Sequence, residues 1–480
     1  MLVVRTTERE VPQNRKAIDI KGFGGIDTRH IRKLGQFSDG KNFWTRSGAL
    51  FTREGCSLIT GTPFTAPIRS IHSAGKAGLT TRLLVEEGVN LWHRLTVGGA
   101  WVNIKNNVAG NTYDSTIWAT PFGDSYLLLV SGAQMLIYDI AAGTITAMQN
   151  LDGGTVPPME FVTTFKGYVF GWAPNYSYAN LVRFCGLDNN ERQSIDYWPE
   201  DHALDVSGNA SEPVIDVIPF QTHLFVLTTK GYYMVYGSGP TNFETSPGGR
   251  VGAYGLRCSA MAGDLAIWLG LDNGVRRVYA YSGTSAFPIS QPIDELLQLA
   301  DFTNVRAHGF GNQFWLLTPA ASKTTAYAFD VMEKAWFIHE FPFRVAAGCG
   351  FGSYLAREYL HLGLHDNRLI MLDDSTTDLG AAITTTFDIG PVNIDNRTFN
   401  VKTFYVNAEP RNDFDIDVYA QVDSKALAGP YTAGFETGEV VTRSVKPRAK
   451  GQNITLRVTT TDKINEIQSA TLTVIPRAVK

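Results

Sequence analysis

Residues 126–130 (YLLLV) and 135–138 (MLIY), with Ser131-Gly132 after the first run, form a unit of two apolar runs separated by a short turn. Strand-forming residues on both sides of a glycine-containing turn are typical of a β-hairpin. Three more units of this kind are residues 223–227 (HLFVL) with 232–236 (YYMVY), 265–269 (LAIWL) with 278–281 (VYAY), and 358–362 (EYLHL) with 369–372 (LIML). The sequence therefore predicts a succession of antiparallel hairpins.

These hairpins return at a nearly constant interval. Further runs of the same type are residues 83–85 (LLV), 168–170 (YVF) and 314–317 (FWLL). One central residue from each run gives the series Leu84, Leu128, Phe170, Phe225, Ile267, Trp315 and Leu360, with intervals of 44, 42, 55, 42, 48 and 45 residues. A period of about 40 to 50 residues, with one antiparallel sheet per period, is typical of β-propeller blades.

A third strand is expected just before several of the hairpins, at residues 68–71 (IRSI), 215–218 (IDVI) and 305–307 (VRA). We therefore predict a β-propeller of six or seven irregular blades over residues 61–378. The alternative for this region is a string of unrelated hairpins in one or two sandwiches, although a sandwich does not require so long a period. A single short helix is expected, around residues 293–299 (IDELLQL).

The pattern changes after Asp373. Residues 383–389 (ITTTFDI), 399–406 (FNVKTFYV), 414–419 (FDIDVY), 454–458 (ITLRV) and 470–475 (ATLTVI) largely alternate apolar and polar side chains. This period of two is typical of strands with one solvated face, so residues 379–480 are predicted to form a small antiparallel β-sandwich. Residues 1–60 are assigned to an N-terminal arm and to strands that close the propeller.

Composition sets broad limits. The 480 residues carry a formal net charge of −4, and no five like charges adjoin. Nothing therefore indicates a basic tail that binds nucleic acid or an anionic membrane. The first residues lack the apolar stretch of a signal peptide, and no segment has 18 consecutive apolar residues. We expect folding in a reducing cytoplasm without membrane insertion, and the widely spaced Cys56, Cys185, Cys258 and Cys349 as buried reduced thiols.

Two groups of residues deserve consideration as metal ligands. His361 and His365 have the spacing of ligands on a helix, but their segment is predicted to be a strand and a turn, where such residues lie far apart. Asp413, Asp415 and Asp417 would share one face of a strand and could attract a cation. The solvated face of an edge strand explains the same row. We interpret both groups as structural or exposed.

Known catalytic motifs are absent from the chain. It contains no G-x-S-x-G elbow, P-loop or H-E-x-x-H sequence, and the glycines of residues 22–25 (GFGG) do not lie in a βαβ unit. We therefore predict a non-enzymatic protein without catalytic, cofactor-binding or metal-binding residues. The alternative is a carbohydrate-binding or glycoside-cleaving propeller, such as an adhesin or a tail-associated glycosidase. A glycosidase would require an aromatic-lined pocket with two carboxylates about 5 to 10 Å apart. A weaker third interpretation is a scaffold for protein complexes.

Several short strings resemble a known family, the tail nozzle or packaged-DNA stabilisation proteins of short-tailed bacteriophages. Residues 48–55 (GALFTREG) are similar to a G-x-L-x-x-R-x-G stretch near the N-termini of those proteins, which often have Pro in place of Glu54. The other similar strings are residues 231–236 (GYYMVY) with 239–243 (GPTNF), 252–256 (GAYGL), 279–283 (YAYSG) with 289–293 (ISQPI), and 450–458 (KGQNITLRV). The resemblance covers most of residues 40–475.

The resemblance implies a structural protein of the virion tail, assembled in the host cytoplasm. A nozzle subunit forms a homo-hexameric ring below the portal and adaptor proteins, with a tail needle and tail fibre or spike proteins as neighbours. The ring seals the exit channel and later conducts double-stranded DNA without sequence-specific binding. The family has no catalytic residues, and no cofactor is expected.

Overall fold

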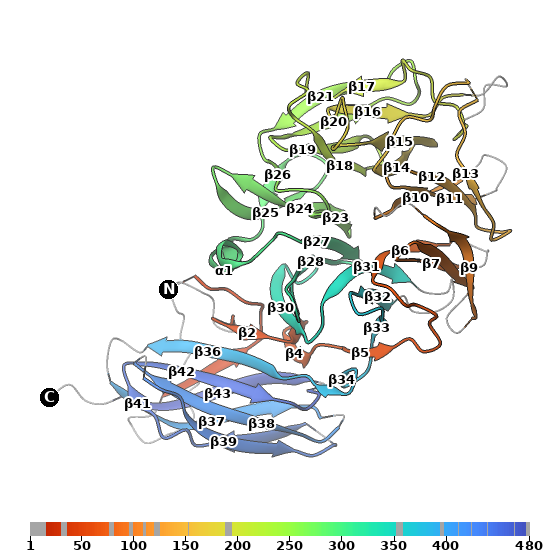
Figure 1. The fold of residues 1–480 in the computed structure, drawn as a ribbon. Coiled ribbons are helices and arrows are strands. Elements are labelled where there is room, and N and C mark those ends of the chain that lie inside the picture. Colours follow the sequence, from red (N-terminus) through yellow and green to blue (C-terminus); the bar gives the residue numbers. More distant parts are fainter. Residues whose placement is uncertain are drawn as a thin grey trace.

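The computed structural model describes residues 16–29, 36–75, 81–95, 99–108, 112–119, 125–151, 153–187, 194–351, 359–393, 398–410, 412–423, 425–438, 440–464 and 466–476. These residues form a seven-bladed β-propeller and a β-sandwich (Figure 1). The predicted fold class, an all-β propeller followed by an antiparallel sandwich, is confirmed.

Blades 1 to 4 are four-stranded antiparallel sheets whose strands follow in chain order. Blade 1 consists of β6 (Ile68–Ala74), β7 (Arg82–Glu87), β8 (Asn90–Leu95) and β9 (Trp101–Asn106). Blade 2 consists of β10 (Asp114–Ala119), β11 (Ser125–Val130), β12 (Met135–Asp139) and β13 (Ile145–Ala147). Blade 3 consists of β14 (Phe161–Phe165), β15 (Tyr168–Trp172), β16 (Leu181–Phe184) and β17 (Ala203–Asp205). Blade 4 consists of β18 (Val214–Pro219), β19 (Leu224–Thr228), β20 (Tyr232–Tyr236) and β21 (Glu244–Gly249).

Blades 5 and 6 continue the same arrangement. Blade 5 consists of β22 (Gly252–Ala253), β23 (Ser259–Ala262), β24 (Leu265–Asp272), β25 (Val275–Tyr281) and β26 (Ala286–Pro288). The 3-10 helix η1 (Gln291–Ile293) and helix α1 (Asp294–Leu299) follow it, where the sequence predicts a short helix. Blade 6 consists of β27 (Arg306–Phe310), β28 (Gln313–Pro319), β29 (Thr324–Asp330) and β30 (Ala335–Phe341).

Blade 7 is completed by a strand from the N-terminal part of the chain. Its own strands are β31 (Val345–Phe351), β32 (Tyr359–Leu364) and β33 (Leu369–Asp373). The outer position is taken by β5 (Gly55–Leu58), which pairs antiparallel with β33. The short strands β34 (Thr377–Asp378) and β35 (Ala381–Ala382) extend this sheet. The predicted boundary between the domains, after residue 378, falls within this segment, which stays hydrogen-bonded to the seventh blade.

The period read from the sequence marks the second strand of every blade. Leu84, Leu128, Phe170, Phe225, Ile267, Trp315 and Leu360 lie on β7, β11, β15, β19, β24, β28 and β32, respectively. These strands read as unbroken apolar runs because neighbouring blades cover both of their faces; every residue of β15 and β19 is buried, for example. The turn between β24 and β25 has Asn273 and Gly274 at φ values of 50° and 81°, as the predicted Asn-Gly hairpin requires.

The sandwich takes strands from both ends of the chain. One sheet has the order β3 (Phe43–Arg46), β4 (Ala49–Thr52), β43 (Ile467–Pro476), β37 (Phe399–Ala408) and β40 (Val441–Val445); β1 (Lys16–Lys21) pairs with β43, and β41 (Lys450–Gly451) with β37. The other has the order β2 (Gly40–Lys41), β36 (Thr385–Asn393), β42 (Asn453–Thr460), β38 (Phe414–Val422) and β39 (Ala428–Phe435). The alternating burial of β38 and β42 matches the predicted period of two.

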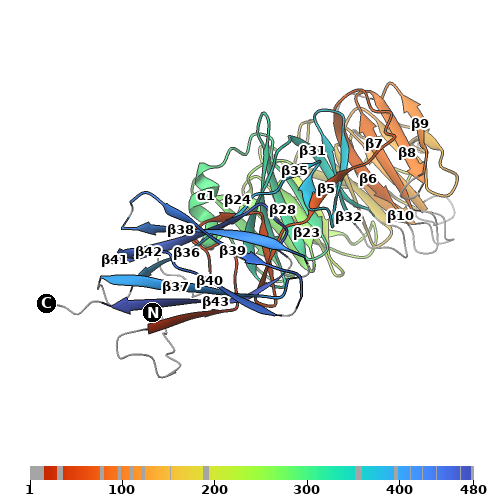
Figure 2. The ribbon, with the colours of Figure 1, turned by 90° about the horizontal axis from the view of Figure 1, so that it is seen from below.

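The N-terminal segment is therefore not only an arm. Strands β1 to β4 belong to the sandwich and β5 belongs to the propeller, so the chain starts in one domain, passes round the other and returns (Figures 1 and 2). The tetrapeptides of β3 and β4 are too short to show a period. Residues 16–21 (KAIDIK) do alternate, with Ile18 and Ile20 buried in the sandwich core.

The chain passes between the sandwich and the propeller at two places, and Arg53 links them. It lies between β4 and β5, and its guanidinium forms a buried ion pair with Asp378, which lies where the chain returns to the sandwich. The same group donates 2.9 Å hydrogen bonds to Oδ1 of Asn42 and to the carbonyl oxygens of Glu54 and Glu340. A single apolar core runs from the sandwich into blades 4 to 7.

Candidate functional site: the axial cavity and the junction cavity

The two histidines considered from the sequence do not meet. His361 is buried on β32, where Nδ1 lies 3.0 Å from the carbonyl oxygen of Tyr359. Burial lowers its pKa to about 4. His365 is exposed in the following turn, where its backbone N–H donates to Arg344. This geometry fits the structural and exposed roles expected for them.

The aspartate row lies at one end of the sandwich. Asp413 accepts hydrogen bonds from the backbone and hydroxyl of Thr437, and Asp417 accepts a 2.6 Å bond from Thr432. Asp415 is exposed on the outer face of β38. Within the described part of the chain, no three His, Cys, Asp or Glu side chains gather as metal ligands would.

All four cysteines have free thiols. Cys56, Cys185 and Cys258 are buried, as expected, whereas Cys349 is half-buried. Burial raises the pKa of the Cys185 and Cys258 thiols to about 12, so both are protonated and unreactive at neutral pH.

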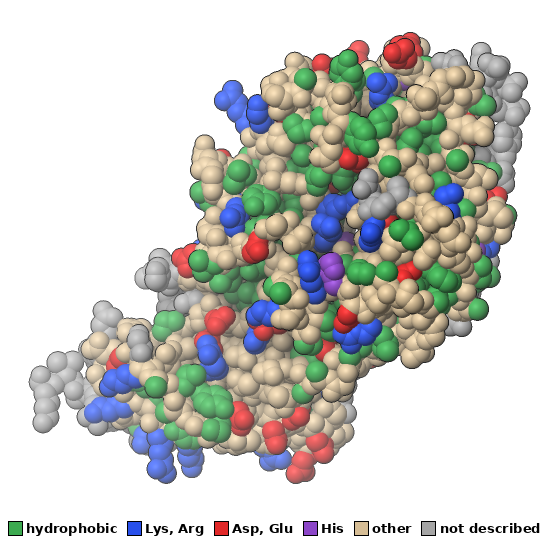
Figure 3. All heavy atoms as spheres, in the orientation of Figure 1, with side chains coloured by type: hydrophobic (Ala, Val, Ile, Leu, Met, Phe, Trp, Pro, Cys, Tyr) green, Lys and Arg blue, Asp and Glu red, His purple; other side chains and the backbone are tan. Residues whose placement is uncertain are grey.

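A polar cavity of ≈ 250 Å³ lies on the propeller axis and is lined by residues from all seven blades. The first strands of successive blades contact one another around it. Its charged and polar lining side chains are Arg69, Ser70, His72, Thr112, Asp114, Ser115, Asp216, Arg257, Ser259, Arg306 and His308. In Figure 3, basic and histidine side chains gather around a hollow in the middle of the propeller.

Two carboxylates in this axial cavity link neighbouring blades. Asp114 Oδ2 accepts a 2.9 Å bond from the backbone of Val162, joining blades 2 and 3. Asp216 Oδ2 accepts a 2.5 Å bond from the Ser259 hydroxyl, joining blades 4 and 5. Burial raises the pKa of Asp114 and raises that of Asp216 to about 6. Both carboxylates are already hydrogen-bonded within the protein.

Two guanidinium groups in the cavity lack an ion pair. Arg257 donates a 3.2 Å bond to the carbonyl oxygen of Thr112, across the axis, and lies over the Phe161 ring at 5.2 Å. Arg306 donates to the carbonyl oxygen of the adjacent Val305. No carboxylate of the described residues lies within 4.0 Å of either group. Burial, and then the positive charge of Arg257, lower the pKa of Arg306 to about 10.

The two histidines of the cavity are held neutral. Burial, and then the charge of Arg257, lower the pKa of His72 to about 3. His72 bridges the Ser70 and Ser115 hydroxyls at 2.8 and 2.7 Å. His308 lies beside Arg306 on the same strand, and burial followed by nearby positive charge lowers its pKa to about 4. The Nε2 atom of His308 is buried without a hydrogen-bond partner in the described structure.

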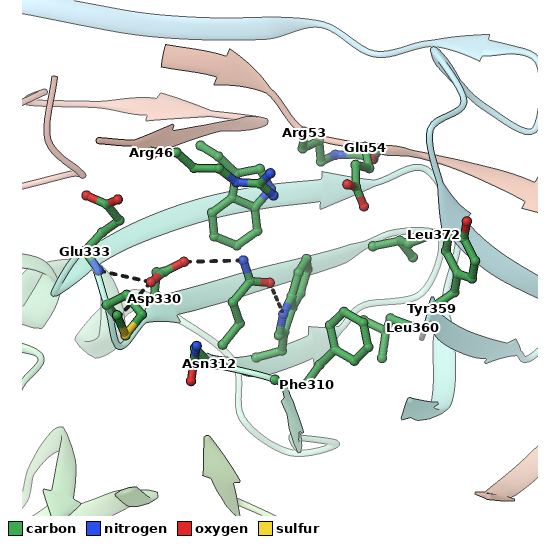
Figure 4. Close-up of a pocket in the computed structure, with 15 residues that line it drawn as sticks. Arg46, Arg53, Glu54, Phe310, Asn312, Asp330, Glu333, Tyr359, Leu360 and Leu372 are labelled. Atoms are coloured by element: carbon green, nitrogen blue, oxygen red, sulfur yellow. Dashed lines mark hydrogen bonds between the residues drawn. The ribbon is translucent and has the colours of Figure 1, made fainter. Parts of the chain in front are cut away.

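A second cavity, of ≈ 420 Å³, lies where the N-terminal strands meet blades 6 and 7 (Figure 4). Aromatic rings of Trp44, Phe310, Trp315 and Tyr359 line it together with the carboxyl groups of Glu54, Asp330 and Glu333. We call it the junction cavity.

The acidic groups of the junction cavity are largely engaged. Trp315 donates to Gln313, which donates to Asp330, and Asp330 also accepts the backbone N–H of Glu333 at 3.1 Å (Figure 4). Glu333 accepts the backbone N–H of Ser47 at 2.8 Å. The junction cavity has the aromatic and acidic composition that the carbohydrate alternative predicts, but these bonds also serve the fold.

Neither cavity was predicted from the sequence, although the sequence contains a signal for the axial one. Arg69, Asp216 and Arg306 each follow an aliphatic residue at the same point of a predicted first strand. A charged residue inside an apolar strand indicates a polar axis once the propeller is assumed. The junction cavity has no such signal, because its walls come from residues about 300 positions apart.

Comparisons with known proteins leave the function open. No family model matches the chain, and no curated protein matches it. Among solved structures, it is similar to a chain of the mitotic checkpoint complex at 10% identity and a TM-score of 0.39, covering 67% of this chain and 93% of that one. It is similar to BBS1N, solved in complex with ARL6DN, at 12% identity and a TM-score of 0.41, covering 68% and 98%.

A chain of the Chaetomium thermophilum Polycomb Repressive Complex 2 is similar at 8% identity and a TM-score of 0.40, covering 68% of this chain and 98% of that one. With TM-scores below 0.5, these likenesses support no statement about function. No helix in the described ranges is long and apolar enough to cross a membrane. The chain is assigned to the β-propeller class by its own seven sheets, and to no family.

Proposed function

We propose that this chain is a structural, non-enzymatic subunit of a phage tail nozzle in the virion tail. Copies would form a hexameric ring below the portal and adaptor proteins, beside a tail needle and fibre or spike proteins. The ring would hold the packaged genome and then conduct double-stranded DNA without binding a particular sequence. The resemblance described above suggests this role. The observation that carries the ring is a separation of charge along the sandwich.

Basic side chains predominate at one end of the sandwich, where the exposed Asp423 also accepts bonds from the backbone of Gln452 and Asn453. Lys446, Arg448 and Lys450 are exposed on the extended segment that joins β40 to β41, and the intervening Pro447 and Ala449 are buried. Lys402 is exposed close by, because the backbone N–H of its neighbour Val401 bonds to the carbonyl oxygen of Ala449. None of these four cations has an ion-pair partner among the described residues.

Acidic side chains predominate at the opposite end, although Arg443 reaches the carbonyl oxygen of Gly434 there and Lys463 adjoins Asp462. Asp413, Asp415, Glu436 and Asp462 are exposed there. Bonds from the backbone of Asp415 to Asp462 and from Thr437 to Asp413 hold the three loops together. In Figure 3, blue groups predominate at one end of the sandwich and red groups at the other, although each end also shows the other colour.

The two ends cannot neutralise each other within one chain. Strand β37 runs between them for 10 residues, which corresponds to roughly 33 Å. The basic end of one copy can meet the acidic end of the next, and such head-to-tail contacts form closed rings when the rotation closes. The Arg53 clamp, which is the ion pair of Arg53 with Asp378 and its bonds to Asn42, Glu54 and Glu340, supports the proposal further, because it links the propeller to the sandwich.

Charge reversal tests the ring. The first variant combines Arg448→Glu and Lys450→Glu. The second combines Asp415→Lys and Glu436→Lys, whose carboxylates form no hydrogen bond or ion pair with the described residues. We expect neither variant to form rings alone, because the altered end loses its net charge and its reversed side chains meet like charges on the next copy. An equimolar mixture should restore even-numbered rings of alternating copies. Cryo-electron microscopy and mass photometry would measure this.

The location in the virion needs a separate measurement. Cryo-electron microscopy of particles that carry the chain should place six copies around the tail axis below the portal. Absence of the chain from purified particles by mass spectrometry would refute the nozzle. Rings that survive both charge reversals would refute the proposed contact.

The junction cavity favours a second candidate, a carbohydrate-binding or glycoside-cleaving propeller. Its four aromatic rings and three carboxyl groups are the composition that sugar sites use. Glycan-array binding and reducing-end release by the wild-type protein would test it, with Asp330→Asn and Glu54→Gln as variants. A monomeric chain that captures or cleaves a polysaccharide through this cavity would replace the nozzle proposal.

A further inference from the structure

Two arginines of the axial cavity have no carboxylate in direct contact among the described residues. Arg257 and Arg306 face the same cavity, and their only hydrogen bonds in the described structure go to the carbonyl oxygens of Thr112 and Val305. Each guanidinium has five N–H donors, so most of its donors remain available. Two such groups near each other in a partly buried space repel, and burial makes this repulsion stronger than in water.

Nearby carboxylates act on Arg257 only through space. Asp114 and, more weakly, Glu86, Glu160 and Asp216 raise its pKa against the larger effect of burial, but none of them forms an ion pair with it, and no carboxylate acts on Arg306 in this way. Asp114 and Asp216 are bonded to Val162 and Ser259 on the walls formed by blades 2 to 5. Arg306 and His308 lie on blade 6. The side chain of His308 adds an unpartnered Nε2 atom to the same wall. Gly348 of blade 7 leaves space there, since a Cβ at that position would come within 3.1 Å of the His308 ring.

We propose that the axial cavity binds a small tetrahedral oxyanion of the phosphate or sulfate class between Arg257 and Arg306. The planar guanidinium fork matches two oxygens of such an anion, and two forks supply the charge that it needs. The cavity volume of ≈ 250 Å³ suits an ion of this size or a single phosphate group. The ligand would relieve the repulsion between the arginines of the neighbouring blades 5 and 6. This site does not depend on the nozzle function.

Thermal unfolding of the full chain tests the site. The probes are inorganic phosphate and sulfate, compared with sodium chloride at equal ionic strength. A ligand that binds only the folded state raises the Tm as its concentration increases, so phosphate and sulfate should raise the Tm while chloride does not. Isothermal titration should then give a Kd for phosphate.

Arg306→Met is the main variant, and Arg250→Met, at an exposed turn, is the matched control. Losing one charged hydrogen-bonding partner should raise the Kd for phosphate about tenfold or more. Without phosphate, Arg306→Met should melt no lower than the wild type, because it removes a repulsion. A residue with a merely structural role would lower the Tm instead. Arg257→Met provides a second variant on the other side of the ion.

Two results would contradict the oxyanion site. An equal response to phosphate and chloride, or an Arg306→Met variant that keeps the full phosphate response, would overturn it. Binding of a short double-stranded DNA should be measured in the same way. If DNA binds through Arg306 and inorganic phosphate does not, the arginines bind a polymer backbone and the free-oxyanion site is wrong.

Discussion

The arginines at the domain junction and at the propeller axis are used in opposite ways. Arg53 at the junction is almost inaccessible and bonds to Asp378, Asn42 and two backbone carbonyls. Arg257 and Arg306 at the axis face a cavity and have no carboxylate partner in the described structure. A charge whose donors are all satisfied indicates a structural role. A buried surplus of donors indicates a place for a ligand, because such groups are costly to leave unpaired.

The largest effect is expected at the junction. Arg53→Met should lower the free energy of unfolding by about 3–5 kcal/mol, because Asp378 is left as a buried charge without its partner. Urea titration followed by tryptophan fluorescence would measure the loss. The double variant Arg53→Met/Asp378→Leu should recover most of it, since no isolated charge remains. A single variant as stable as the wild type would show that the clamp contributes little.

Asn42 supports the same clamp and should have the next largest effect. Its Oδ1 accepts bonds from Arg53 and from the backbone of Glu340, and its Nδ2 donates to Thr384. Asn42→Gly should cost about 2–3 kcal/mol for the lost bonds. Asn42→Ala should cost about 1 kcal/mol more, because φ at this position is 62° and an alanine side chain disfavours that conformation. Equal Tm values for the two variants would rule out the backbone contribution.

Near the axis, a buried carboxyl group should weaken the fold at alkaline pH. Burial raises the pKa of Glu86 on β7 to about 7, and its Oε1 atom has no hydrogen-bond partner in the described structure. Its folded pKa lies above its unfolded value, so its contribution is most favourable below about pH 4.5 and is lost as pH rises toward 7.

Glu86→Gln keeps an acceptor for Ser70 and cannot ionise. We expect it to raise the free energy of unfolding by roughly 1–2 kcal/mol at pH 8 and to have little effect at pH 4. Urea titrations at the two pH values would measure the difference. A gain that is equal at both values would mean that ionisation of Glu86 is not its cause.

The axial histidines should act with the opposite sign. The folded pKa values of His72 and His308 are about 3 and 4, below the ordinary value of 6.5. Their unfolded forms bind protons first, so stability is lost as pH falls from 6.5 toward 4. His308→Gln should reduce this loss by about 1–2 kcal/mol, measured by urea titration at pH 7 and pH 4.5. An unchanged pH slope would contradict the low pKa of His308.

The sequence predicted the repetitive parts of the molecule well and the single contacts poorly. All seven periodic residues lie on second strands, because these strands are covered on both faces and so become continuous apolar runs. The C-terminal strands of the sandwich were recognised by their alternating apolar and polar residues, since one face of each strand is exposed to solvent. Strands β1 to β4 were not assigned to the sandwich. They are short and distant in the sequence from their partner strands, so nothing in their residues indicates which sheet they join.

The sequence by itself therefore determined the all-β class, the radial repeat and the change from apolar runs to alternating residues after Asp373. These features are visible because the burial of each strand leaves a pattern in neighbouring residues. Only the tertiary structure decided that β1 to β4 join the sandwich, that Arg53 meets Asp378, and that Arg257 and Arg306 share a cavity. Those pairs are separated by 325 and 49 residues, respectively. Their proximity depends on how the chain closes around the axis, and no local preference along the sequence encodes that closure.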